Sequence, residues 1–123
     1  MTNLSHIPPI RDQLGRALRD LRISVMDRCN FRCVYCMPED KFHPGFKFLP
    51  SKERLSFDEM LRLVRIFTKL GVTKIRITGG EPLLRVNLTD FIGDLSTLDN
   101  IKDIALTTNG VLLKKYAYEL KAS

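Results

Sequence analysis

The chain has 123 residues, and its 20 lysines and arginines outweigh 14 aspartates and glutamates, so the net charge is +6. A domain of typical size has about 150 residues, so the length predicts one domain. With 44% hydrophobic and 28% charged residues, the composition is that of a globular protein and excludes a disordered or collagen-like chain. No apolar run approaches the roughly 18 residues of a membrane span, so we expect no membrane partner.

The first part of the chain predicts a leader, a strand and a long connection. Residues 1–20 form a polar leader without the apolar segment of a secretion signal, which favours a cytoplasmic protein. Residues 21–26 alternate apolar and polar side chains and predict a strand. Residues 27–52 contain all the cysteines. A connection of this length inside a compact domain is usually functional.

Helices and strands then alternate to the end of the chain. Ser56 followed by Glu59 is a capping-box pattern, which predicts a helix beginning there, and Gly71 is suited to end it. Residues 74–78 alternate again and predict a second strand. Further along, the patterns predict a helix at about 88–98, a strand at 103–107 and a helix at 112–121.

This order indicates an α/β fold. Strands that alternate with helices form right-handed βα units around a parallel sheet. A closed eight-fold β/α barrel of the TIM type takes about 250 residues, roughly twice this length. We therefore expect residues 21–123 to form the amino-terminal part of a TIM-type barrel, that is, a partial barrel belonging to a larger protein.

The three cysteines, Cys29, Cys33 and Cys36, lie within eight residues. An odd, crowded set does not suit a secreted disulfide framework and indicates a metal site in a reducing compartment. Thiolates select zinc, copper(I) or iron–sulfur clusters. A structural zinc site needs four protein ligands, and the nearest histidine is His43. An iron–sulfur cluster on three cysteines keeps one iron open for a ligand, so this interpretation is favoured and zinc remains the alternative.

The spacing Cys-x3-Cys-x2-Cys is the signature of the radical S-adenosylmethionine (SAM) superfamily. Within it, five segments jointly resemble the amino-terminal part of the GTP 3′,8-cyclases, the molybdenum cofactor biosynthesis protein A family: residues 21–24, 27–33, 35–38, 74–83 and 106–110. The resemblance implies a [4Fe–4S] cluster held by Cys29, Cys33 and Cys36, SAM bound to the open iron, and GTP as the substrate of a 5′-deoxyadenosyl radical.

The resemblance also implies residues that bind SAM. Gly79, Gly80 and Glu81 belong to the loop that contacts the methionine part, with Gly80 the foremost candidate, because glycine lets a backbone approach a ligand closely. Tyr35 matches an aromatic position near the adenine. The simpler interpretations are a plain strand-to-helix turn for the glycines and a core residue for Tyr35.

By the same resemblance Arg22, Lys74, Arg76 and Thr107 contact GTP. The strand pattern supports part of this independently, because residues two apart on a strand point to the same face. Arginine and lysine side chains on one face of a parallel sheet would suit a triphosphate. The alternative is a solvent-exposed strand face.

The resemblance implies a radical SAM lyase, homodimeric at full length, whose product passes to the next enzyme of molybdopterin synthesis. No catalytic residue is assigned, and we expect the isolated chain to be inactive. The alternatives are another radical SAM enzyme and a small basic zinc module that contacts nucleic acid. The chain lacks the aromatic and basic stripe that favours the latter, so no nucleic-acid partner is expected.

Overall fold

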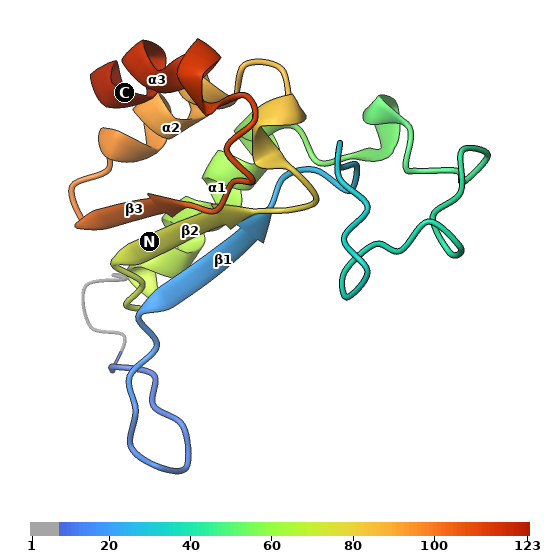
Figure 1. Cartoon of the computed structure of the whole chain (residues 1–123). Coiled ribbons are helices and arrows are strands. Elements are labelled where there is room, and N and C mark those ends of the chain that lie inside the picture. The colour runs from blue at the N-terminus through green and yellow to red at the C-terminus, as the bar shows by residue number, and fades with distance from the viewer. Residues whose placement is uncertain (1–7) are drawn as a thin grey trace.

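The computed structural model describes residues 8–123, so the first seven residues of the predicted leader lie outside the described residues. In this part of the chain, strands and helices alternate as the sequence predicts (Figure 1). The elements are β1 (Asp20–Ser24), η2 (Ser51–Glu53), α1 (Phe57–Lys69), β2 (Lys74–Thr78), η3 (Pro82–Leu84), α2 (Leu88–Ser96), β3 (Asp103–Leu106) and α3 (Leu113–Ala122). No helix between residues 8 and 123 is both long and apolar enough to cross a membrane.

The three strands form one parallel sheet in the order β1-β2-β3. Ile23 lies opposite Ile77, and Ile77 lies opposite Leu106, so apolar side chains share one face along the whole register. The α/β class and the parallel arrangement are confirmed. Because the strands are parallel, the loops that leave them all begin at the same edge of the sheet.

Helix α1 begins where the sequence predicts. The Glu59 amide donates to Ser56 Oγ at 3.1 Å, and the Ser56 amide donates to Glu59 Oε2 at 2.7 Å, so both parts of the capping box form. Gly71 follows the helix with a φ of +113°, a left-handed conformation that suits glycine. The chain then turns back and enters β2.

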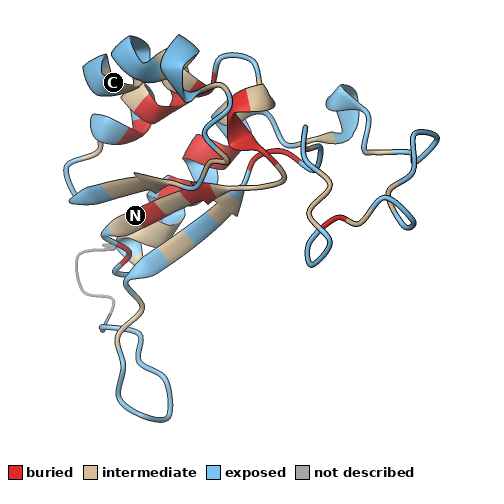
Figure 2. Cartoon of the chain, viewed as in Figure 1, coloured by how far each residue is buried: buried red, intermediate tan, exposed pale blue. Residues whose placement is uncertain are grey.

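The core lies between the apolar face of the sheet and helices α1 and α2 (Figure 2). Ile75 and Ile77 of β2 are fully buried against Val64 of α1 and Phe91 of α2. The Phe57 and Phe91 rings stack with centroids 4.5 Å apart and so join the two helices. Polar side chains alternate onto the opposite face of the sheet, as period two requires.

The first strand is shorter than predicted. It ends at Ser24, whereas the alternating pattern predicts a strand through Met26. Val25 still donates its amide to Thr78 O at 2.9 Å, but Val25 and Met26 are both buried, which breaks the alternation between faces. The chain leaves the sheet here, and Met26 O accepts from the Gly80 amide of the loop that follows β2.

The capping box gives a stability prediction. Replacing Ser56 by alanine removes the side-chain acceptor of the Glu59 amide, which costs about 1 kcal/mol. We expect Ser56→Ala to lower the free energy of unfolding by this amount in urea denaturation. Ser51→Ala serves as the control, because Ser51 is exposed and caps no α-helix. Equal stability of the two variants would contradict the proposed contribution of the cap.

Candidate functional site

The loops that follow the three strands meet at the carboxyl edge of the sheet. We call them the cysteine loop (residues 27–50), the glycine loop (79–82) and the β3 loop (107–110). The Glu81 amide donates to Arg28 O at 2.8 Å, which joins the first two loops. The Asn109 amide donates to Glu81 Oε2 at 2.8 Å, which joins the second and third. The structure thus gathers three sequence motifs into one strand-end site.

Glu81 is the buried centre of this site, with only 1% of its surface exposed. Its Oε1 accepts from Thr108 Oγ1 at 2.6 Å and from the Leu83 amide at 3.3 Å. Its Oε2 accepts from the Asn109 amide. A buried carboxylate is tolerated only when hydrogen bonds replace its lost hydration. These donors therefore fix the glycine loop and the β3 loop in one mutual arrangement.

The two glycines leave room for the start of the cysteine loop. A Cβ on Gly79 would lie 2.4 Å from Met26 O, and one on Gly80 would lie 2.1 Å from Arg28 O. Gly79 also has a φ of +152°, which disfavours other residues. The Gly80 amide donates to Met26 O. The glycine loop is thus more than a plain turn, because it holds the backbone that leads to Cys29.

All three cysteines are free thiols. Cys33 and Cys36 share a tight turn, in which the amides of Cys36 and Met37 both donate to Cys33 O at 3.0 Å. Cys29 and Cys33 are partly buried, and Cys36 is exposed. Met37, buried within the loop, follows this turn directly.

The sequence predicts that the three thiols converge on one metal centre, but in the structure they do not. Between residues 8 and 123, no group of three histidine, cysteine, aspartate or glutamate side chains is close enough to hold a metal ion. The donor chemistry nevertheless suits a thiophilic metal, since the three cysteines form no disulfide and lie on one long loop that leaves the body of the fold (Figure 1). A metal-binding loop rarely forms its final geometry without the metal, because the binding energy orders it.

Arg32 organises the cysteine loop from within. Its Nη1 donates to Cys29 O at 2.8 Å, and its Nε donates to Phe42 O at 3.1 Å. The guanidinium groups of Arg28 and Arg32 each lie 5.9 Å from the centroid of the Phe48 ring. These contacts fold the second half of the loop back onto its first half.

Arg85 joins the backbone segments that precede and follow the cysteine loop. Its Nη1 donates to Val25 O at 3.0 Å, its Nη2 donates to Leu55 O at 2.6 Å, and its guanidinium lies 4.2 Å from the centroid of the Phe57 ring. Burial, with a smaller repulsion from Arg54, lowers the pKa of Arg85 below its usual value. Arginine stays charged under such conditions and keeps its donors.

A row of cationic side chains lies on the polar face of the sheet, which the core helices leave open. Arg22 of β1 is directly opposite Arg76 of β2 in the register. Arg76 Nη1 donates to Thr107 Oγ1 at 3.2 Å, so these two predicted residues are brought together. Lys74 instead forms an ion pair with Asp103 at 3.1 Å. Within residues 8–123, neither Arg22 nor Arg76 has a carboxylate partner in an ion pair.

Tyr35 is not a core residue, because 89% of its surface is exposed. It lies between Cys33 and Cys36 in the cysteine loop. Its contact with an adenine stays a prediction.

The sequence analysis missed Asn109 and Arg85. Asn109 reaches the cysteine loop, where its Nδ2 donates to Asn30 Oδ1 at 2.7 Å. In the sequence, Asn109 followed by Gly110 is typical of a turn, and Arg85 resembles any surface arginine. The partners that reveal their roles are distant in the chain, because Val25 lies 60 positions from Arg85 and Asn30 lies 79 positions from Asn109.

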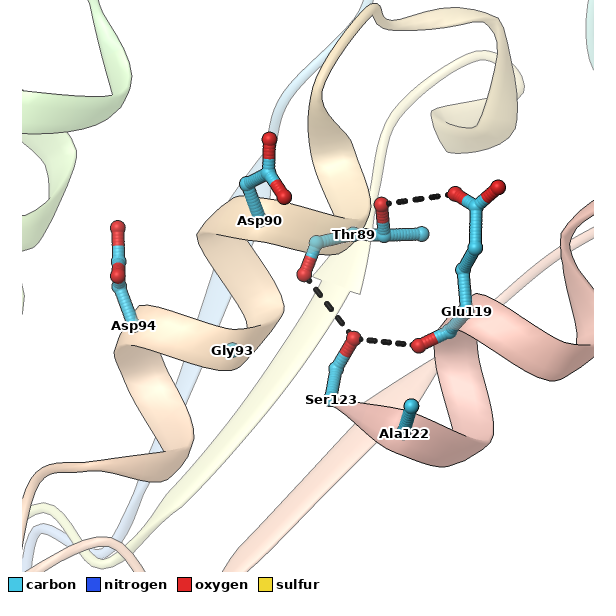
Figure 3. A pocket seen from close by; sticks show the side chains of 7 residues that line it. All are labelled: Thr89, Asp90, Gly93, Asp94, Glu119, Ala122 and Ser123. Atoms are coloured by element: carbon cyan, nitrogen blue, oxygen red, sulfur yellow. Dashed lines mark hydrogen bonds between the residues drawn. The ribbon is translucent and has the colours of Figure 1, made fainter.

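A pocket between α2 and α3 lies apart from these motifs (Figure 3). Glu119 Oε2 accepts from Thr89 Oγ1 at 3.2 Å, and Ser123 Oγ donates to Thr89 O at 3.1 Å. Asp90 and Asp94 project from α2 along its rim. None of the predicted site residues lines it, so the pocket adds nothing to the strand-end site.

Comparisons with known proteins show the family of the chain. The family model described as "Radical SAM superfamily" matches residues 23–123, and the chain belongs to this superfamily. Its members in general use a [4Fe–4S] cluster and SAM. Proteins named GTP 3′,8-cyclase are similar over 114 residues: one from Staphylococcus aureus strain Mu3 at 58% identity and one from Staphylococcus haemolyticus at 56%. These alignments cover 93% of the chain and 34% of each relative, so the chain spans about a third of their length.

The contact at Gly80 gives the prediction for this site. Because a Cβ would collide with the backbone of Arg28, we expect Gly80→Ala to displace the cysteine loop and speed amide hydrogen exchange over residues 27–33. Gly93→Ala is the matched control, since nothing lies within 4 Å of its Cβ position on α2. Alanine in a helix interior is preferred over glycine by about 1 kcal/mol, so this control should be neutral or stabilising. Unchanged exchange in Gly80→Ala would contradict the tight packing.

Proposed function

We propose that this chain forms the amino-terminal part of a radical SAM GTP 3′,8-cyclase, the enzyme of the first step of molybdenum cofactor biosynthesis. The observation that carries the proposal is the meeting of the cysteine loop, the glycine loop and the β3 loop at one edge of the sheet, next to the cationic row. The names of the relatives at 56–58% identity support the substrate.

Cys29, Cys33 and Cys36 would hold the [4Fe–4S] cluster through their thiolates. Three protein ligands leave one iron for SAM. When bound, the cluster and SAM supply the reducing electron and the radical that abstracts hydrogen. The chain's contribution is to place the sulfur donors, and Arg32 and Arg85 do this by fixing the backbone on either side of Cys29.

The glycine loop and Tyr35 would bind SAM. Gly79 and Gly80 are partly exposed at the strand-end site and carry no side chain, which would allow the methionine part to approach their backbone on the side away from Met26 and Arg28. Glu81 keeps this loop in place, and its carboxylate oxygens are already engaged by Leu83, Thr108 and Asn109. Tyr35 is free to cover an adenine because its ring is exposed.

The triphosphate of GTP would bind on the cationic row of Arg22, Lys74 and Arg76, together with Thr107. Like charges directly opposite on neighbouring strands are unfavourable, and Arg22 and Arg76 lie in this arrangement. A bound anion removes this cost, and the fork-shaped guanidinium matches phosphate oxygens. Thr107 orients Arg76 by accepting its hydrogen bond.

The proposal extends to the whole protein of which this chain forms part. Residues 21–123 would be the first βα units of a TIM-type barrel whose interior is the open polar face of the sheet, and residues 1–20 would precede it. By resemblance, the full-length enzyme would be a cytoplasmic homodimer that passes its product to the next enzyme of molybdopterin synthesis. A three-stranded sheet encloses no barrel interior, so we expect these residues by themselves not to convert GTP.

Metal loading tests the first part of the proposal. After anaerobic incubation with iron and sulfide, we expect the chain to bind a cluster with a visible absorption band and a paramagnetic reduced state. Cys29→Ala, Cys33→Ala and Cys36→Ala should each abolish it, because a thiolate ligand is lost. His43→Ala should bind the cluster normally. Stoichiometric zinc without iron, dependent on His43, would contradict the proposal.

Nucleotide binding tests the cationic row. We expect Arg22→Ala and Arg76→Ala to weaken GTP binding about tenfold or more at low salt, since charge-assisted hydrogen bonds contribute about 1.5–3 kcal/mol each. Arg62→Ala is the control, because Arg62 is exposed on α1. Isothermal titration calorimetry measures the affinities. Equal losses in all three variants would reveal only nonspecific charge attraction.

A further inference from the structure

Asn109 connects two loops that lie 80 positions apart in the chain. Its side-chain Nδ2 is 2.7 Å from Asn30 Oδ1 and 3.8 Å from Cys29 Sγ. Its backbone amide donates to the buried Glu81 carboxylate at 2.8 Å. The residue is therefore anchored by its backbone to the glycine loop and by its side chain to the cysteine loop.

The orientation of the Asn109 carboxamide is fixed by its surroundings. The Val111 amide donates to Asn109 Oδ1 at 3.1 Å. A backbone N–H can only donate, so the oxygen must face Val111 and the NH2 group must face the cysteine loop. Both N–H bonds of that group thus have an acceptor nearby, the Asn30 oxygen and the Cys29 sulfur.

We propose that Asn109 is a positioning residue that ties the cysteine loop to the β3 loop and donates a hydrogen bond to the sulfur of Cys29, including when that sulfur binds iron. The second half of this statement rests on the proposed cluster. Groups that donate hydrogen bonds to ligand sulfurs orient them and change the electronic properties of the metal centre. Such a bond stabilises the reduced cluster, which carries more negative charge than the oxidised one. It therefore raises the reduction potential of the cluster.

The chain offers matched variants for the test. Asn109→Asp keeps the shape and the acceptor for Val111, but it replaces the donor by an oxygen that faces Asn30 and Cys29. Asn109→Ala removes the side chain beyond Cβ. Asn100→Ala is the control, since Asn100 is exposed in the connection between α2 and β3. Circular dichroism establishes that each variant retains the fold.

The first measurement needs no metal. Amide hydrogen exchange of the cysteine loop is followed in the metal-free chain, with attention to Phe31, whose amide donates to Cys29 Sγ at 3.4 Å. We expect exchange over residues 29–33 to become about fivefold faster in both Asn109 variants and to stay unchanged in Asn100→Ala. Unchanged exchange in the Asn109 variants would overturn the inference, whether or not the chain binds a cluster.

The second measurement uses the chain loaded with iron and sulfide. We expect both Asn109 variants to bind the cluster with a more negative reduction potential than the parent chain and Asn100→Ala. The same potential in all four proteins would overturn the hydrogen bond to sulfur. A parent chain that binds no iron would instead contradict the proposed function, and the exchange measurement would still decide the role of Asn109.

Discussion

The strand-end site depends on the burial of one carboxylate. Glu81 is almost fully removed from solvent, and an ionised carboxylate in such a place is unfavourable unless donors replace water. The hydroxyl of Thr108 and the amides of Leu83 and Asn109 supply them. Two of these donors, Thr108 and Asn109, belong to the β3 loop. The Glu81 carboxylate is therefore fully hydrogen-bonded only when the glycine loop and the β3 loop are both in place. Removing one donor costs more free energy than its hydrogen bond contributes, because the buried carboxylate is then left unsatisfied.

The cysteine loop is held to this centre by complementary means. On one side the backbone of Met26 and Arg28 packs directly against Gly79 and Gly80, where a larger side chain would leave no room. On the other side it is held by polar contacts, from Arg85 to Val25 and from Asn109 to Asn30. The beginning of the loop is therefore fixed, while the segment that contains Cys33 and Cys36 extends into solvent. This division suits a ligand-binding loop, whose outer part gains its final shape from the ligand.

Local sequence patterns predicted the elements well, since their causes are local. The capping box of α1 needs only Ser56 and Glu59, and the bounds of β2 follow from alternation over five residues. The prediction failed at the end of β1, where Val25 and Met26 are consecutive buried residues that the alternating pattern had placed on opposite faces. It also could not reveal that Glu81 connects loops, because its partner Thr108 lies 27 positions further along the chain.

The opposed arginines of the sheet and the three free thiols contribute nothing evident to the stability of the fold, and for this reason they indicate function. Arg22 and Arg76 lie opposite each other on neighbouring strands, and no described carboxylate forms an ion pair with either, whereas Lys74 pairs with Asp103. The three free thiols likewise contribute no contact to the apolar core. A sequence that only had to fold would replace these groups with residues of better local compatibility. Arg76 contacts Thr107 of the β3 loop, and in the same loop Thr108 donates to Glu81 while Asn109 lies next to Cys29. The cationic row and the cysteine loop are thus both joined to the β3 loop, and this connection supports our proposal that they serve one site for an anionic substrate and a thiophilic cofactor.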